Sequence, residues 1–241
     1  MKMKIITTIT MGLLAASLVS AAETDTTAPV KTAITKLKSQ PSYSWTTKLQ
    51  MPGMPFTPEP SHGKIGSDGI ALVTQSFNGN DTQVVFKGDK VAVLADGQWE
   101  AVSTNRDAGD MGNFPMMIAG WLAGSGTAAK EAETLLGNVK ELKVGEDGLW
   151  SGDLTDKGIA GLLAFGPRPG DAPAVKNGKG TAKFWVKDGA LVKFESHAEG
   201  LVSVPDQDDR DMNMTRTIEI SDAGKTQFDI PDAARKKLDS N

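Results

Sequence analysis

Residues 82–99 read TQVVFKGDKVAVLADGQW, and this stretch decides the fold class. Two turn dipeptides interrupt it, Gly88-Asp89 and Asp96-Gly97. Around these turns lie three short runs rich in apolar residues, at 82–87, 90–95 and 98–103. Glycine and aspartate at two-residue turns supply the positive φ that a tight hairpin requires. Short strands joined in this way predict an antiparallel β-meander.

The same pattern extends outward from this stretch in both directions. Residues 42–50 alternate apolar and polar side chains with period two, which predicts a half-buried strand. Similar turn dipeptides occur before and after the meander, at Asp68-Gly69, Asn78-Gly79, Asp147-Gly148 and Asp188-Gly189. The further predicted strands are 70–77, 139–144, 149–150, 181–187, 190–198, 214–221 and 226–230.

Elsewhere the apolar residues recur every three to four positions, which predicts amphipathic helices. The clearest stripe consists of Val30, Ala33, Ile34 and Leu37. Pro29 suits the first turn of this helix, and Pro41 stops it. Further helices are predicted at 115–123, at 128–136, directly after Leu154-Thr155-Asp156 and at 233–238. Three segments are predicted loops: the Pro-rich 51–60, the Pro/Gly-rich 166–180 and the acidic 206–211. The sequence therefore predicts one α+β domain, with apolar helices inserted in a long antiparallel sheet.

The composition excludes several classes of function. The chain has no Cys, so it has no disulfide, no thiolate nucleophile and no Cys-ligated metal centre. Its formal net charge of −4 provides no basic footprint for nucleic acid. No cofactor motif is present, since the Gly-rich 123–128 segment lacks the Lys-Ser/Thr ending of a phosphate loop.

Residues 1–21 have the pattern of a signal peptide. Lys2 and Lys4 precede an apolar stretch at 5–19, and small residues around Ala21 suit cleavage there. Cleavage would leave one domain at 22–241 and, by removing two lysines, change the formal charge from −4 to −6. No Cys follows for lipid attachment, and no second long apolar run could span a membrane. We therefore expect a soluble periplasmic or secreted protein with only transient membrane contact.

Four segments also carry a family resemblance in their pattern and order. They are the helix that leads into the Trp45 strand, the meander 84–91 with Gly97-Gln98-Trp99, the segment 150–155, and 183–194 with the closing 230–234. In these segments the chain resembles the bacterial outer-membrane lipoprotein carrier-like superfamily, which includes LolA/LolB and LppX/LprG-type lipid-binding proteins. The resemblance implies a half-barrel, a strongly curved antiparallel sheet of about eleven strands, with short helices covering its concave face.

The resemblance further implies a cavity for lipid, or for the acyl chain of a lipoprotein, between the sheet and the helices. Eight apolar residues would form the cavity and its gate: Trp45, Trp99, Phe114, Met116, Met117, Trp121, Leu122 and Trp185. Methionine and tryptophan beside glycine combine a large contact area with adaptable packing, which suits a gate. Alternatively, the residues at 114–122 form part of an ordinary core beneath the sheet. No catalytic residue, metal or cofactor is expected in this cavity.

Two other functions remain open. An interaction or sensory module would use the same fold to bind an envelope protein partner. A hydrolase would use His62, next to a predicted turn, or His197, late in a strand, but no Gly-x-Ser-x-Gly elbow presents a serine. The alternating carboxylates of Asp206–Asp211 resemble the start of a calcium loop, yet the required glycine and distal glutamate are missing. We therefore expect a solvated loop there.

Overall fold

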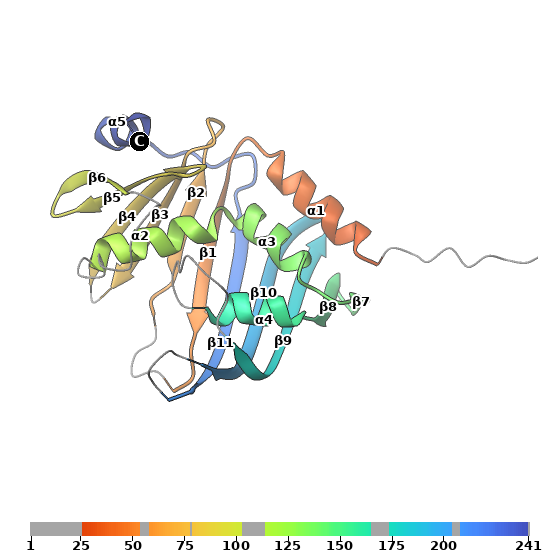
Figure 1. Ribbon diagram of the computed structural model, residues 1–241. Helices are drawn as coiled ribbons and strands as arrows, with labels where there is room; N and C mark the ends of the chain where they lie inside the picture. Colours follow the sequence, from red (N-terminus) through yellow and green to blue (C-terminus); the bar gives the residue numbers. More distant parts are fainter. Residues whose placement is uncertain are drawn as a thin grey trace, which may run out of the picture.

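A single antiparallel sheet forms the body of the protein (Figure 1). The computed structural model describes residues 26–53, 58–77, 79–102, 114–164, 174–203 and 208–240. The strands are β1 (Tyr43–Gln50), β2 (Ser61–Ile65), β3 (Ala71–Phe77), β4 (Asn80–Lys87), β5 (Lys90–Ala95), β6 (Gln98–Val102), β7 (Lys143–Val144), β8 (Leu149–Asp153), β9 (Val175–Lys187), β10 (Ala190–Val202) and β11 (Arg210–Ser221). The helices are α1 (Ala28–Lys38), α2 (Phe114–Ser125), α3 (Ala128–Leu136), α4 (Asp156–Leu163) and α5 (Asp232–Asp239).

The sheet has 11 strands in the order β6-β5-β4-β3-β2-β1-β11-β10-β9-β8-β7 and is not closed. Almost every strand pairs with its neighbour in sequence, as hairpins and a meander require. The exception is β1, which pairs with β2 on one side and with β11 on the other. This pairing joins the two halves of the sheet and leaves β6 and β7 as its edges. The fold is therefore the α+β domain that the sequence pattern predicts, with the open sheet of a half-barrel that the resemblance implies.

The two faces of the sheet bury different clusters of side chains. On β4, Val84 and Phe86 join a large cluster that includes residues of α1, α2, α3 and α4, whereas Val85 joins a smaller one with α5. We call the side covered by α1 to α4 the inner face, and the opposite side the outer face. In Figure 1, α5 lies across β4–β6 from α2. This part of the sheet is thus covered on both sides, which explains why residues 91–95 of β5 and residues 84–86 of β4 are continuous apolar runs.

Local sequence explains where the helices begin. Thr127 and Thr155 occupy the N-caps of α3 and α4. The Thr127 hydroxyl oxygen accepts a hydrogen bond from the Lys130 amide at 3.4 Å, and the Thr155 hydroxyl oxygen accepts one from the Gly158 amide at 3.1 Å. These bonds satisfy amide groups that the first turn of a helix leaves without a partner. One amide group in the first turn of each helix is therefore hydrogen-bonded by the threonine that precedes the helix.

Several sequence predictions are confirmed. Helix α3 covers the predicted 128–136, α2 and α5 extend one or two residues beyond their predicted ends, and α1 extends one or two residues beyond the apolar stripe that predicted it. At Asp96-Gly97 and Asp188-Gly189 all four residues have positive φ, between 49° and 78°. This is the geometry of the tight hairpin turns from which the meander was predicted.

Other predictions are wrong at particular elements. Residues 226–230 form no strand; Phe228 and Ile230 instead pack in the outer-face cluster with α5. His62 lies in strand β2, which was not predicted, and not beside a turn. Strand β9 begins at Val175, inside the predicted loop 166–180, and β11 begins at Arg210. Helix α5 covers the outer face, whereas all short helices were expected on the concave side.

Some predictions fall outside the described residues. These are the signal peptide at 1–21, the 166–173 part of the predicted loop, and parts of the segments 51–60 and 206–211. Among the helices of the described ranges, none is both long and apolar enough to cross a membrane.

Candidate functional site

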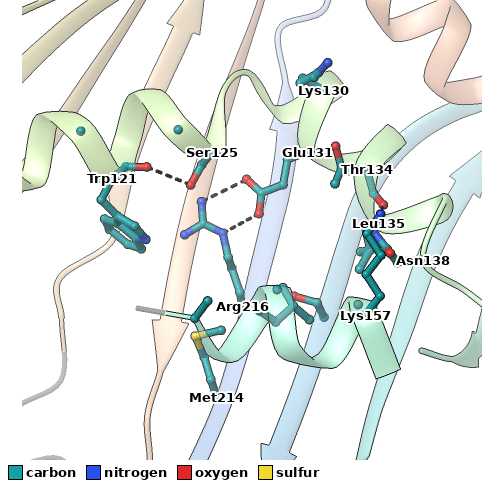
Figure 2. Close-up of a pocket in the computed structure, with 17 residues that line it drawn as sticks. Trp121, Ser125, Lys130, Glu131, Thr134, Leu135, Asn138, Lys157, Met214 and Arg216 are labelled. Atoms are coloured by element: carbon teal, nitrogen blue, oxygen red, sulfur yellow. Dashed lines mark hydrogen bonds and ion pairs between the residues drawn. The ribbon is translucent and has the colours of Figure 1, made fainter. Parts of the chain in front are cut away.

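A cavity of about 510 Å³ lies between the inner face of the sheet and helices α2, α3 and α4 (Figure 2). This volume falls in the range of small-molecule and cofactor sites. Its lining residues are Gly120, Trp121, Gly124, Ser125, Lys130, Glu131, Thr134, Leu135, Asn138, Lys157, Gly158, Gly161, Leu162, Ala164, Ser196, Met214 and Arg216. The lining thus comes from three separate helices and from two adjacent strands, β10 and β11.

Helix α2 contributes one face to the cavity and another to the core. Trp121 and Gly124 line the cavity, whereas Ala119 and Leu122 are buried in the inner-face cluster. Ser125 donates a hydrogen bond from its hydroxyl to the Trp121 carbonyl at 3.2 Å, within the same helix. The cavity wall is therefore formed by a helix whose other side is fixed by packing.

Glycine leaves space in two of the walls. A Cβ atom added at Gly124 on α2, or at Gly161 on α4, would meet no described atom within 4 Å. Glycine in a helix costs about 1 kcal/mol relative to alanine. At Gly158 the reason is packing, since a Cβ there would lie 2.8 Å from the Cβ of Asn138. Gly124 and Gly161 have no such contact; both are exposed in the cavity lining, where a side chain would occupy open space.

The floor of the cavity is formed by inward-facing residues of β10 and β11. Ser196 pairs with Arg216 across these strands, and Ala198 pairs with Met214. Side chains alternate between the faces of a strand. Met214 and Arg216 therefore point to the same inner side as the buried Ile218.

Arg216 connects the floor with two of the covering helices. Its Nε and Nη2 donate hydrogen bonds to the two carboxylate oxygens of Glu131 on α3, at 2.5 and 3.0 Å. The guanidinium also lies over the indole of Trp121 on α2, 5.3 Å from the ring centroid. A bidentate pair of this kind, with the arginine side chain only 9% exposed, holds its partners in a defined geometry. Figure 2 shows Trp121, Arg216 and Glu131 together at one end of the cavity.

Tyr43 provides a second link between the sheet and α3. The Ala129 amide donates a hydrogen bond to the Tyr43 hydroxyl oxygen at 3.3 Å. Burial raises the pKa of Tyr43, and the smaller effects of hydrogen bonds with Thr127 and Ala129 lower it. The phenol therefore stays protonated at neutral pH, and the first turn of α3 is fixed on β1.

The predicted gate residues of α2 have different environments. Trp121 lines the cavity, and Leu122 is 4% exposed within the inner-face cluster. Met116 is partly buried against that cluster. Phe114 and Met117 belong to α2, but their side chains lie outside the described part of the structure.

The three tryptophans predicted on the sheet are not brought together. Trp45 is buried on the inner face, where it occupies the space that a side chain at Gly63 would take. Trp99 lies on the outer face, in the cluster with α5. Trp185 is partly exposed beneath the ammonium group of Lys193, 4.3 Å from the ring centroid, and alternates with the inner-face residue Phe184. None of the three lines the cavity of Figure 2.

The two histidines do not approach the cavity either. His62 contacts the Thr46 hydroxyl through Nδ1 at 3.3 Å, and His197 contacts the Thr215 hydroxyl through Nδ1 at 3.0 Å. Both alternate in their strands with inward-facing residues, so both lie on the outer face. In the acidic loop, Asp209 pairs with Lys176 at 2.8 Å, and the described residues contain no cluster of three or more metal-binding side chains.

The sequence analysis missed the polar residues of the cavity, Arg216 and Glu131 among them. A signal for Arg216 was available. It lies between Met214 and Ile218 on β11, at a position where the alternation of the strand predicts an inward-facing apolar residue. Glu131 offered no such signal, because its partner is 85 residues away in sequence.

No family model matches the sequence, and no curated protein matches it. Among solved structures, the fold is similar to lipoprotein LppX of Mycobacterium tuberculosis, with 10% identity and a TM-score of 0.45 over 83% of this chain and 96% of that one. LprF of Mycobacterium bovis has 13% identity and a TM-score of 0.44 over 86% and 96%. A LolA superfamily protein of Nitrosomonas europaea has 12% identity and a TM-score of 0.34 over 85% and 94%. The likeness is one of fold alone.

Proposed function

We propose that the protein binds a lipid, or the acyl chain of a lipoprotein, in the cavity between the inner face and helices α2 to α4. The observation that carries the proposal is the lining of this cavity. Trp121, Leu135, Leu162 and Met214 supply apolar surface, and glycines of α2 and α4 leave room beside them. Each methylene transferred from water to such a surface contributes roughly 0.8 kcal/mol. An acyl chain would therefore bind without a covalent or charged contact.

The proposed role is binding and carriage without catalysis. Both histidines lie on the outer face, away from the cavity lining. The one buried ion pair in the lining, between Arg216 and Glu131, engages both carboxylate oxygens and so stabilises the assembly of helices on the sheet. With the export signal expected at 1–21, the protein would act as a soluble periplasmic carrier. An envelope protein that delivers or receives the ligand belongs to the same proposal.

Trp121 is a natural reporter for this function, because it is the tryptophan in the cavity lining. Bromine atoms on an acyl chain quench tryptophan fluorescence on contact, so we would titrate the protein with a phospholipid carrying a dibrominated acyl chain. The expected result is saturable quenching that is largely lost in Trp121→Phe. The matched control is Trp185→Phe, which removes an outer-face tryptophan and should leave the ligand-dependent quenching unchanged.

The two variants also distinguish binding in the cavity from binding on the outer face. Quenching that is lost in Trp185→Phe and kept in Trp121→Phe would move the binding site to the outer face. An absence of saturable quenching in the wild-type protein would contradict lipid binding altogether.

A further inference from the structure

We propose that the ligand is an anionic amphiphile, whose acidic headgroup binds to Lys157 at one end of the cavity while its chain lies along the apolar lining. This inference rests on the proposed function and specifies its ligand class. The acidic group is a carboxylate or a phosphate, since an ammonium group binds both as a point charge.

The first observation is the charge of the lining. It contains three basic residues, Lys130, Lys157 and Arg216, but a single acidic residue, Glu131. The lining thus has a formal charge of +2, in a chain whose formal net charge is −4. A concentration of positive charge inside an acidic protein favours an anionic ligand.

The second observation concerns which of these cations are already neutralised. Arg216 forms a bidentate pair with Glu131. Lys130 lies near Glu133, whose pKa is lowered mainly by Lys38 and to a smaller extent by Lys130. The lysines that form ion pairs among the described residues are Lys38, Lys48, Lys176, Lys179 and Lys183. Neither Lys130 nor Lys157 is one of them, but Lys130 interacts through its charge with Glu133, so Lys157 is the cation of the lining whose charge is least offset.

The third observation is where Lys157 lies. It belongs to the first turn of α4, and this turn is fixed to the end of α3 by the Thr155 amide, which donates to the Asn138 carbonyl at 2.8 Å. Asn138 donates in turn to the Thr134 carbonyl at 2.8 Å. Lys157 therefore lies at the Asn138 end of the cavity, opposite the end with Trp121 and Arg216 (Figure 2).

Helix stability does not explain a lysine at this position. The positive end of the helix dipole disfavours a cation in the first turn. Asp156 precedes Lys157, but adjacent helical residues do not face each other, and Asp156 is not in the lining. An anion at the Asn138 end would offset the unfavourable charge. The remaining lining gives the ligand its direction, with the headgroup at Lys157 and the chain against Leu135, Leu162 and Met214.

The test uses isothermal titration calorimetry of the whole protein with three ligands, of which the two lysophospholipids are kept below their critical micelle concentrations. Palmitoyl-lysophosphatidic acid and palmitoyl-lysophosphatidylcholine share one acyl chain, but only the first has a net negative headgroup. Glycerol 3-phosphate supplies the acidic group without a chain. The variants are Lys157→Gln and, as matched control, Lys140→Gln, an exposed lysine two residues after Asn138 that does not line the cavity.

We expect the wild-type protein to bind the lysophosphatidic acid about three- to tenfold more tightly than the lysophosphatidylcholine, as one partly exposed ion pair provides. Lys157→Gln should remove this preference without weakening the lysophosphatidylcholine, while Lys140→Gln retains it. Glycerol 3-phosphate should bind far more weakly than either lipid.

Three results would overturn the inference. The first is equal affinity of the wild-type protein for the two lipids, which leaves the proposed function intact. The second is an equal effect of both lysine variants, which would show a general charge effect. The third is binding of glycerol 3-phosphate as tightly as the lysophosphatidic acid, which would identify a free-anion site. If neither lipid binds, the proposed function fails together with the inference.

Discussion

Arg216 on β11 and Glu131 on α3 form a bidentate ion pair that joins the sheet to one of its covering helices, with donor–acceptor distances of 2.5 and 3.0 Å. The arginine side chain is 9% exposed and the glutamate side chain 19% exposed. The pair lies in the cavity lining, so the same contact closes one end of the cavity and fixes α3 on the sheet. Its removal should therefore affect both stability and binding.

Glu131→Gln should destabilise the protein by about 2–4 kcal/mol, because it leaves the buried guanidinium without its counter-charge. The double variant Arg216→Met/Glu131→Leu should recover part of this loss, since no unpaired charge remains. Urea unfolding followed by tryptophan fluorescence measures both. Glu133→Gln is the control, because Glu133 lies on the same helix in an exposed pair with Lys38 and should leave the midpoint nearly unchanged. Equal effects of the two glutamate substitutions would contradict a special role for the Arg216 pair.

Gly161→Leu should separate binding from stability. Gly161 lines the cavity, and a Cβ there meets no described atom within 4 Å, so a larger side chain starts in open space beside the ligand. Replacing a helical glycine also favours the helix, by about 0.8 kcal/mol. We therefore expect an equal or higher unfolding midpoint together with at least tenfold weaker lipid binding, the latter corresponding to about 1.4 kcal/mol. Gly137→Ala, at the exposed C-cap of α3, should leave binding unchanged. Full lipid affinity in Gly161→Leu would mean that the ligand lies elsewhere.

Gly63→Ala should destabilise the sheet through Trp45. The added methyl group would overlap the indole, which lies directly over Gly63 in the neighbouring strand. Overpacking of this kind typically costs about 1–3 kcal/mol. In the background Trp45→Leu the same methyl group should cost much less, because the ring is gone. A double-mutant cycle measured by urea unfolding checks this, and additive effects of the two substitutions would contradict it.

Glu195 should make stability depend on pH in the acidic range. Burial raises the pKa of Glu195, but hydrogen bonds from Lys183 and Thr217 and the charges of Lys183 and Lys193 outweigh it and hold the pKa below its ordinary value. The unfolded chain therefore binds this proton more readily than the folded one. The carboxylate contributes stability above its ordinary pKa, and this contribution is lost as pH falls through the lowered folded value.

The measurement is the difference in unfolding free energy between the wild-type protein and Glu195→Gln as a function of pH. The difference should be largest at neutral pH and should diminish below the ordinary glutamate range. A difference that is the same at every pH would mean that Glu195 acts through packing and not through its charge.

Much of the fold could be predicted because it depends on local signals. The hairpins follow from turns such as Asp96-Gly97, whose positive φ only a few residue types adopt readily. Helix α1 follows from a stripe that starts at Val30 and from the proline at its first turn. Residues 226–230 were mistaken for a strand because their pattern does not say what they pack against, and Phe228 and Ile230 join the outer-face cluster with α5. The pairing of β1 with β11 also joins distant parts of the chain, which no local pattern connects.

The cavity could be predicted only in part, for a similar reason. Trp121 was identified because an apolar stretch beside glycines is visible in the sequence. Trp99 and Trp185 were grouped with it because all three are large and apolar, yet both alternate onto the outer face of their strands. Consecutive residues such as Phe184 and Trp185 point to opposite faces of the sheet. Deciding which of them faces the cavity therefore requires the register of the strand. Glu131 and Arg216 required the packing of α3 on the sheet.

The most direct test of whether the cavity holds a lipid is native mass spectrometry of the protein purified without detergent from a bacterial periplasm, before and after organic extraction. Binding in the cavity predicts a discrete adduct of lipid mass that disappears on extraction and is absent from Gly161→Leu purified in the same way. A wild-type protein that shows only its own mass, and still does so after incubation with envelope lipids, would contradict lipid binding.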